Sequence, residues 1–123
     1  MKFRCVHTNF NVLDLDKSVQ FYQEALGLVE KRRKVHPEGK FILVYMGNER
    51  SDYEIELTWL RDRKEAYDLG DEEFHICFRC DDYESAHKKH QDMGCIAFEN
   101  TEMGLYFIKD PDGYWIEIVR ERD

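Results

Sequence analysis

The amino-acid sequence predicts an α+β protein built from two βαβββ modules that pair around a cleft. The chain runs through one order of elements twice: a strand-like run, a segment with helical spacing, and three more strand-like runs. The copies are almost in register, because His7 precedes Gly27 by 20 positions and His75 precedes Gly94 by 19. A module of about 60 residues is marginal as a separate core. The two modules are therefore expected to fold together or to pair with another chain. We expect a single domain over residues 1–123, with one module at about 1–60 and the other at about 74–123.

The elements of the first module follow from periodicity and from capping residues. In "DLDKSVQFYQEALG", Asp14 is suited to the N-cap, apolar residues recur at helical spacing, and Gly27 ends the helix. β-branched and aromatic residues concentrate in the runs expected to form strands, which are 3–12, 28–35, 40–46 and 53–59.

The second module repeats this arrangement. In "DDYESAHKKHQDMG", Asp82 is suited to the N-cap and Gly94 ends the helix. The turn "DPDG" at 110–113 separates the last two strand-like runs. The strands are expected at 74–80, 95–99, 104–109 and 114–120.

Composition and charge exclude several functions. The formal net charge of −8 argues against binding nucleic acid or anionic membranes, because both need a positive field. The one basic cluster, "EKRRK" at 30–34, is interpreted as the solvated face of a strand. No apolar run is long enough for a signal peptide or a membrane span, so the cytoplasm is the expected compartment.

Cys77 and Cys80 are three apart on a strand and point to opposite faces, which favours ordinary reduced thiols over a metal or redox pair.

Four residues with unusual positions suggest a metal site. Glu56 and Glu117 interrupt apolar closing strands, and His7 and His75 open the two modules. An isolated buried carboxylate is unfavourable. Each residue alone could be structural, but if the first and last strands of each module are neighbours, all four side chains converge. Two nitrogens and two oxygens suit zinc, nickel, cobalt or iron. By contrast, His87 and His90 lie beside lysines and are interpreted as a solvated or partly buried helix face.

Four segments resemble a known family: "HTNFNVLDLDKSVQFYQEALGL", "IELT", "FHICF" and "FIKDPDGYWIEI". Together they cover essentially the whole chain, and the last is the most specific. The sequence resembles the vicinal oxygen chelate superfamily and, within it, the short bacterial form of the glyoxalase I (lactoylglutathione lyase) family.

The resemblance implies a methylglyoxal-detoxifying lyase. Such an enzyme isomerises the hemithioacetal of methylglyoxal and a thiol, with glutathione as the expected thiol, to an S-lactoyl thioester through an enediolate. The metal ligands would be His7, Glu56, His75 and Glu117. Glu117 would be the proton-shuttling base, while Glu56 would be a ligand and the alternative base. Short members imply nickel or cobalt, with zinc as the alternative, and a homodimer.

Substrate contacts are expected at Asn11, Leu60, Arg79 and Met103. Asn11 and Leu60 stand where glutathione-using members carry arginine and asparagine, which puts the identity of the thiol in question. Arg79 has the strand parity of His75. It is interpreted as an exposed charge at the strand end, with compensation for the missing arginine as the alternative. Other members of the superfamily remain alternatives: an acyl-CoA epimerase, a thiol transferase, or a ligand-binding protein.

Overall fold

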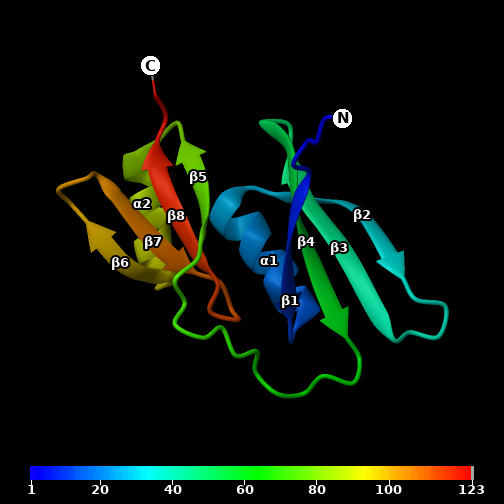
Figure 1. Ribbon diagram of the computed structural model, residues 1–123. Coiled ribbons are helices and arrows are strands. Elements are labelled where there is room, and N and C mark those ends of the chain that lie inside the picture. The colour runs from blue at the N-terminus through cyan, green and yellow to red at the C-terminus, as the bar shows by residue number, and fades with distance from the viewer. Residues whose placement is uncertain (123) are drawn as a thin grey trace. The chain divides into compact units, whose positions relative to one another are not determined.

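The chain forms two compact units, residues 1–67 and 68–123, each with one four-stranded sheet and one helix (Figure 1). This computed structural model describes residues 1–122. The order of elements in each unit is βαβββ, so the predicted fold class is confirmed. That the two modules form one domain stays a prediction.

Unit 1 contains the first helix and four strands. Its elements are β1 (His7–Val12), α1 (Leu15–Leu26), β2 (Val29–Val35), β3 (Phe41–Asn48) and β4 (Ser51–Leu60). The strand order is β1-β4-β3-β2, in which β1 runs parallel to β4 and the other neighbours are antiparallel. The first and last strands of the module are therefore neighbours, as the metal-site hypothesis requires.

Unit 2 has the same topology. Its elements are β5 (Ile76–Cys80), α2 (Tyr83–Met93), β6 (Ile96–Asn100), β7 (Leu105–Lys109) and β8 (Trp115–Arg120). The strand order is β5-β8-β7-β6, and β5 runs parallel to β8.

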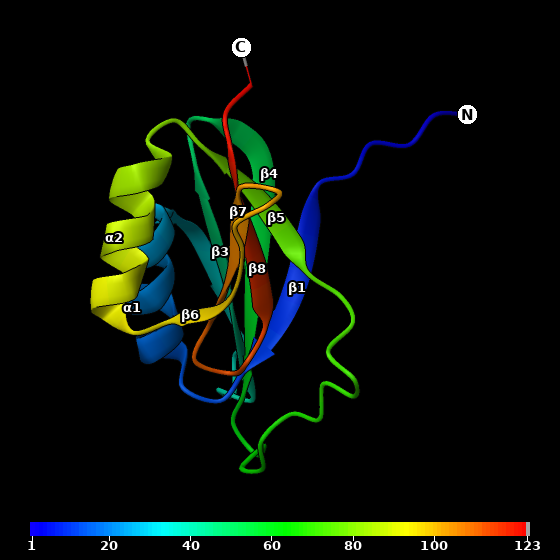
Figure 2. The same cartoon turned by 90° about the vertical axis from the view of Figure 1, so that its left-hand side faces the viewer.

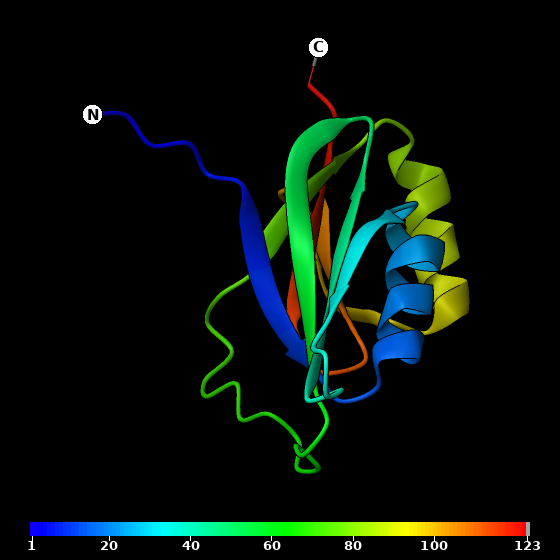
Figure 3. The same cartoon turned by 90° about the vertical axis from the view of Figure 1, so that its right-hand side faces the viewer.

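Each sheet has an apolar face and a more polar face, because successive strand residues point to opposite sides. Figure 3 shows α1 along one face of the sheet of unit 1, and Figure 2 shows α2 on one side of the sheet that contains β7 and β8. Strand residues of one parity are fully or almost fully buried. They are Phe10, Val12, Val44, Met46, Ile55 and Leu57 in unit 1, and Tyr106, Ile108, Ile116 and Ile118 in unit 2. Each such side chain contributes roughly 1.5–3 kcal/mol of burial free energy, so the core fixes which face is left for chemistry.

The two helices begin and end in the same way. Asp14 accepts a hydrogen bond from the Lys17 N–H, and Asp82 accepts one from the Ser85 N–H. Gly27 and Gly94 end the helices in the left-handed conformation, with φ of 64° and 70°. Glycine adopts this conformation without the strain that a Cβ would introduce.

Two strands begin two or more residues later than the sequence predicts. β1 starts at His7 rather than Phe3, and β5 starts at Ile76 rather than Phe74. In Figures 2 and 3 the residues before β1 run away from the sheet, where Met1 and Phe3 are exposed. Apolar composition alone does not make a strand, because a strand also needs a neighbour to pair its backbone groups.

The basic cluster lies on β2, an edge strand that is exposed at all seven positions. Arg33 pairs with Glu30 of the same strand, and Arg32 donates to both carboxylate oxygens of Glu54 at 2.8 Å. The prediction of a solvated strand face is therefore confirmed. The four cysteines are free thiols, and no helix within residues 1–122 is long and apolar enough to cross a membrane.

Candidate metal centre

In unit 1, the candidate ligands His7 and Glu56 lie together on the face opposite the core. The pairing of the strands aligns Arg32 with Tyr45, Tyr45 with Glu56, and Glu56 with Asn9, so that these four residues form one row across the sheet. His7 is two residues before Asn9 and shares its face. Its Nε2 lies 3.9 Å from Glu56 Oε1.

Neighbouring side chains hold the Glu56 carboxylate in place. The phenol of Tyr45 donates a short hydrogen bond to Glu56 Oε2. This bond, followed by burial and by the negative charge of Glu56, raises the pKa of Tyr45 above its ordinary value. The amide of Asn9, with its nitrogen turned toward the carboxylate, donates to Oε1 at 2.8 Å. Glu56 is therefore an oriented carboxylate rather than a freely rotating one.

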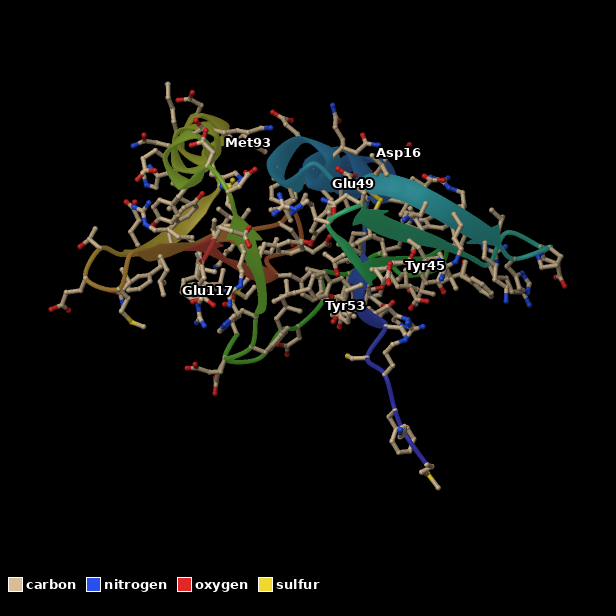
Figure 4. The ribbon with its side chains drawn as sticks, turned by 90° about the horizontal axis from the view of Figure 1, so that it is seen from above. Asp16, Tyr45, Glu49, Tyr53, Met93 and Glu117 are labelled. Atoms are coloured by element: carbon tan, nitrogen blue, oxygen red, sulfur yellow. The ribbon has the colours of Figure 1, made fainter. Side chains whose placement is uncertain are left out.

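In unit 2, His75 and Glu117 form the matching pair, with His75 Nε2 3.4 Å from Glu117 Oε1. The corresponding row across this sheet is Phe98, Phe107, Glu117 and Cys77. Partial burial, and then a hydrogen bond to Glu117, raise the pKa of the Cys77 thiol to about 11. In Figure 4, Glu117 and Met93 of α2 lie on opposite sides of the sheet, as Tyr45 and Asp16 of α1 do in unit 1.

The two pairs fit a divalent metal ion in donor type and spacing. Donors held at about 2.0–2.2 Å from one ion lie about 3–4 Å apart, which matches both histidine–glutamate distances. The carboxylates are 15% and 17% exposed and the imidazoles 40% and 44%, so the carboxylates are largely removed from water while the imidazoles remain accessible. Within residues 1–122, no three His, Cys, Asp or Glu side chains gather closely enough to hold an ion. Each unit supplies two donors of the predicted set of four.

A second group of titratable side chains lies on the helix side of unit 2. His87 contacts Glu99 through a short hydrogen bond, and His90, which is 1% exposed, bonds the Tyr106 hydroxyl at 2.8 Å. Burial raises the pKa of Tyr106 above its ordinary value. These contacts connect α2 to the sheet, which supports a structural role for both histidines. His90 is, however, fully buried rather than solvated or partly buried as the sequence suggested.

With this geometry established, comparison with known proteins gives the family. The model of the Glyoxalase/Bleomycin resistance protein/Dioxygenase superfamily matches residues 4–118. The chain belongs to this superfamily.

Within the superfamily, the chain is similar to glyoxalase I enzymes. It is 38% identical to a lactoylglutathione lyase of Neisseria meningitidis serogroup A, over 97% of this chain and 91% of that protein. It is 35% identical to a lactoylglutathione lyase of Escherichia coli O157:H7, over 98% and 94%. Among solved structures, the trypanothione-dependent glyoxalase I of Leishmania major matches with a TM-score of 0.86 at 32% identity, over 98% of this chain and 88% of that one. The resemblance to glyoxalase I is confirmed, and with it the prediction that this superfamily member is an enzyme.

Three of the four residues predicted to bind substrate lie on strands, and the fourth lies in a loop. Asn11 lies on β1 with its side chain against that of Asn9, and Leu60 ends β4 with the parity of Glu56. Arg79 lies on β5 with the parity of Cys77, which bonds Glu117. Met103 is exposed in the loop between β6 and β7. Asn11, Leu60 and Arg79 thus share the site face of their own sheets, whereas Met103 lies outside the strands.

Sequence reasoning missed three side chains that touch the candidate ligands. Tyr45 and Asn9 contact Glu56, and Cys77 contacts Glu117. Asn9 and Cys77 could have been found, because each is two residues after a candidate histidine and so shares its face. No spacing along the chain marks Tyr45, because its contact with Glu56 follows from the pairing of β3 with β4.

Proposed function

We propose that this chain is a metal-dependent glyoxalase I. It would convert the hemithioacetal of methylglyoxal and a thiol, with glutathione as the first choice, to the S-lactoyl thioester. The observation that carries the proposal is the matched pair of half-sites, each with one histidine and one glutamate on the polar face of its sheet. The similarity to lactoylglutathione lyases supports the same reaction.

In this proposal His7, Glu56, His75 and Glu117 hold one divalent ion. Two imidazoles and two carboxylates suit nickel and cobalt, which we favour, and zinc is the alternative. The bound ion would act as a Lewis acid for negative charge that develops on the substrate oxygens.

Glu117 is the proposed proton carrier. Its carboxylate takes the proton from C1 of the hemithioacetal and returns it to the adjacent carbon, while the proton of the C1 hydroxyl moves to the oxygen of that carbon, so the isomerisation gains and loses no atoms. The neighbours of Glu117 support this role. It pairs across the sheet with Phe107, which offers no hydrogen bond, and with Cys77, whose thiol is a weak donor, so neither neighbour holds the carboxylate strongly in one orientation. Glu56 is the second carboxylate ligand in this scheme.

The thiol moiety of the substrate is assigned to Asn11, Leu60, Arg79 and Met103. Arg79 is the cation of this set and would bind a carboxylate of the thiol. Asn11 offers a neutral amide and Leu60 an apolar contact. We therefore expect a low-molecular-weight thiol that carries a carboxylate.

The decisive experiment removes the metal and reloads the protein separately with nickel, cobalt and zinc. Thioester formation is then followed from methylglyoxal with glutathione and with other low-molecular-weight thiols. Turnover with glutathione supports the complete proposal, while turnover with another thiol alone keeps the reaction and changes the cosubstrate. No turnover with any combination contradicts the proposal and favours an epimerase or thiol-transferase activity.

The family resemblance further leads us to propose a homodimer that functions in the cytoplasm. Sedimentation velocity of the metal-loaded protein tests the oligomeric state, and a monomer at micromolar concentration would contradict it.

A further inference from the structure

The two candidate glutamates have different cross-strand neighbours. Tyr45 of β3 pairs with Glu56, and Phe107 of β7 occupies the equivalent position opposite Glu117. Both neighbours are aromatic, and each ring packs edge-to-face on the histidine of its half-site, with centroids 6.0 Å apart for His7–Tyr45 and 5.1 Å for His75–Phe107. The two half-sites therefore match in shape but differ by one hydroxyl.

That hydroxyl is fixed by contacts that extend across three strands. The Arg32 guanidinium lies 3.8 Å from the centroid of the Tyr45 ring, and Arg32 is itself held by both oxygens of Glu54. A cation placed over an aromatic face restrains the ring. The Tyr45 phenol is thus held toward Glu56 Oε2 by groups that lie outside the candidate ligand set.

The hydrogen bond makes the two carboxylates unequal. With Oε2 bound to Tyr45, Glu56 presents Oε1 on the side of His7 and cannot rotate without losing the bond. Glu117 has no phenol opposite it, because Phe107 can neither donate nor accept. The Cys77 thiol, a weak donor, is the contact that bonds Glu117.

We propose that Tyr45 is a positioning residue that fixes Glu56 as a permanent, single-oxygen metal ligand and thereby leaves proton transfer to Glu117. This inference rests on the proposed function for its catalytic consequence. Its structural part concerns metal binding alone and can be measured without substrate.

The test exchanges the two aromatic residues. Tyr45→Phe removes the hydroxyl from the first half-site, Phe107→Tyr adds one to the second, and a double variant combines both changes. Tyr53→Phe is the matched control, because it removes a phenol of the same unit that bonds Thr8 rather than a candidate ligand. Far-UV circular dichroism establishes that each metal-free variant is folded.

Metal affinity is the primary readout, measured for cobalt and nickel by competition with a chromophoric chelator. We expect Tyr45→Phe to raise the Kd about 10-fold or more, as is typical for loss of a group that orients a ligand. The visible absorption spectrum of the cobalt-loaded protein should also change, because the ligand field depends on how Glu56 binds. Tyr53→Phe should change neither. Unchanged affinity and an unchanged cobalt spectrum in Tyr45→Phe would overturn the inference.

The kinetic readout separates the roles of the glutamates. At saturating metal, Phe107→Tyr should reduce kcat about 10-fold or more without weakening metal binding, because the new hydroxyl restrains the proton carrier. Full kcat in Phe107→Tyr would overturn the inference that Glu117 transfers the proton because no hydroxyl restrains it. If the wild-type protein binds metal but does not isomerise the hemithioacetal, the proposed reaction fails, while the metal affinities still decide the role of Tyr45.

Discussion

Glu56 and Glu117 are flanked by similar residues along the chain and by different residues across the sheet. Each lies between two aliphatic residues and three positions after a tyrosine. Across the sheet, however, Glu56 faces a phenol and an amide while Glu117 faces a phenyl ring and a thiol. Cross-strand neighbours are the closest contacts that a strand side chain makes. Strand pairing therefore gives two duplicated residues different chemistry.

The first prediction concerns Glu56 itself. Glu56→Gln keeps the shape of the side chain but removes the charge that a divalent ion requires, so we expect kcat/KM to fall by about 100-fold or more. Thioester formation by the nickel-loaded variant measures this. His87→Ala is the control, because His87 bonds Glu99 on the helix side of unit 2 and should retain full activity. Wild-type activity in Glu56→Gln would rule out the proposed site.

The four candidate ligands could be predicted from the sequence, but Tyr45 could not. Matched spacing in two copies identifies residues on equivalent strands, which is why His7, Glu56, His75 and Glu117 were found. The neighbour of Glu56 depends on the β3–β4 register, which shifts between Met46 and Asn48. Extending the Asn48–Ser51 pairing without the shift would place Glu54 opposite Tyr45. An irregularity of this kind leaves no periodic signal in the sequence.

At the scale of single elements, the turn at 110–113 positions β8 and therefore Glu117. Asp110 is 5% exposed, and its Oδ1 accepts hydrogen bonds from the N–H groups of Asp112 and Tyr114. Asp110 N–H also bonds the Tyr114 carbonyl. A short side chain that accepts hydrogen bonds from the backbone N–H groups two and four residues later stabilises the turn.

The second prediction follows from this turn. Asp110→Ala leaves buried N–H groups without an acceptor, so we expect the free energy of unfolding to fall by about 1–3 kcal/mol. Urea denaturation measures the difference. Asp110→Asn keeps an oxygen at Oδ1, so its free energy of unfolding should fall clearly less than that of Asp110→Ala. Equal losses in both variants would show that the charge, rather than the acceptor, stabilises the turn.

The segment before β5 is attached to the sheet of unit 2 through Glu72. Its carboxylate accepts from Trp115 Nε1 at 3.0 Å and lies 3.3 Å from Lys109 Nζ. The hydrogen bond from Trp115, and then that from Lys109, hold the pKa of Glu72 below its ordinary value of 4.5. A lowered pKa in the folded state gives stabilisation that is present above about pH 4.5 and is lost as the pH falls through the lowered value.

The third prediction uses this pH dependence. Glu72→Gln should be less stable than the wild-type protein at pH 7, and the difference should shrink as the pH falls below 4.5. Chemical denaturation at several pH values between 3 and 7 measures both. Glu73→Gln removes an equal charge from the next position and is the control. A difference that is constant with pH would exclude ionisation of Glu72 as its cause.

At the scale of the whole molecule, the candidate ligands are divided two and two between the units. The fold class and the topology of each unit could be predicted, because the repeat appears twice and each copy carries its own caps and periodicity. The placement of one pair relative to the other could not be predicted, because it depends on contacts between modules or chains that no local pattern encodes.

The fourth prediction concerns metal and stability. In the proposed site the ion is bound by the folded protein and not by the unfolded chain, so metal at 100 times its Kd should raise the free energy of unfolding by about 2.7 kcal/mol. Thermal or urea unfolding with nickel and with excess chelator measures the difference. His7→Ala and His75→Ala should each reduce it, although they belong to different units. Full metal stabilisation in either variant would show that one unit binds the ion alone.

Strand β2 shows how the chain protects a vulnerable part of its own surface. An edge strand exposes unpaired backbone donors and acceptors, which can recruit the edge of another molecule into a continuous sheet. Four consecutive cationic residues, Lys31 to Lys34, occupy this edge in a chain that is otherwise strongly acidic. Two such edges repel one another on approach, and the long side chains must lose water and freedom before the backbones can meet. The basic cluster therefore discourages the ordered self-association to which exposed strands are prone.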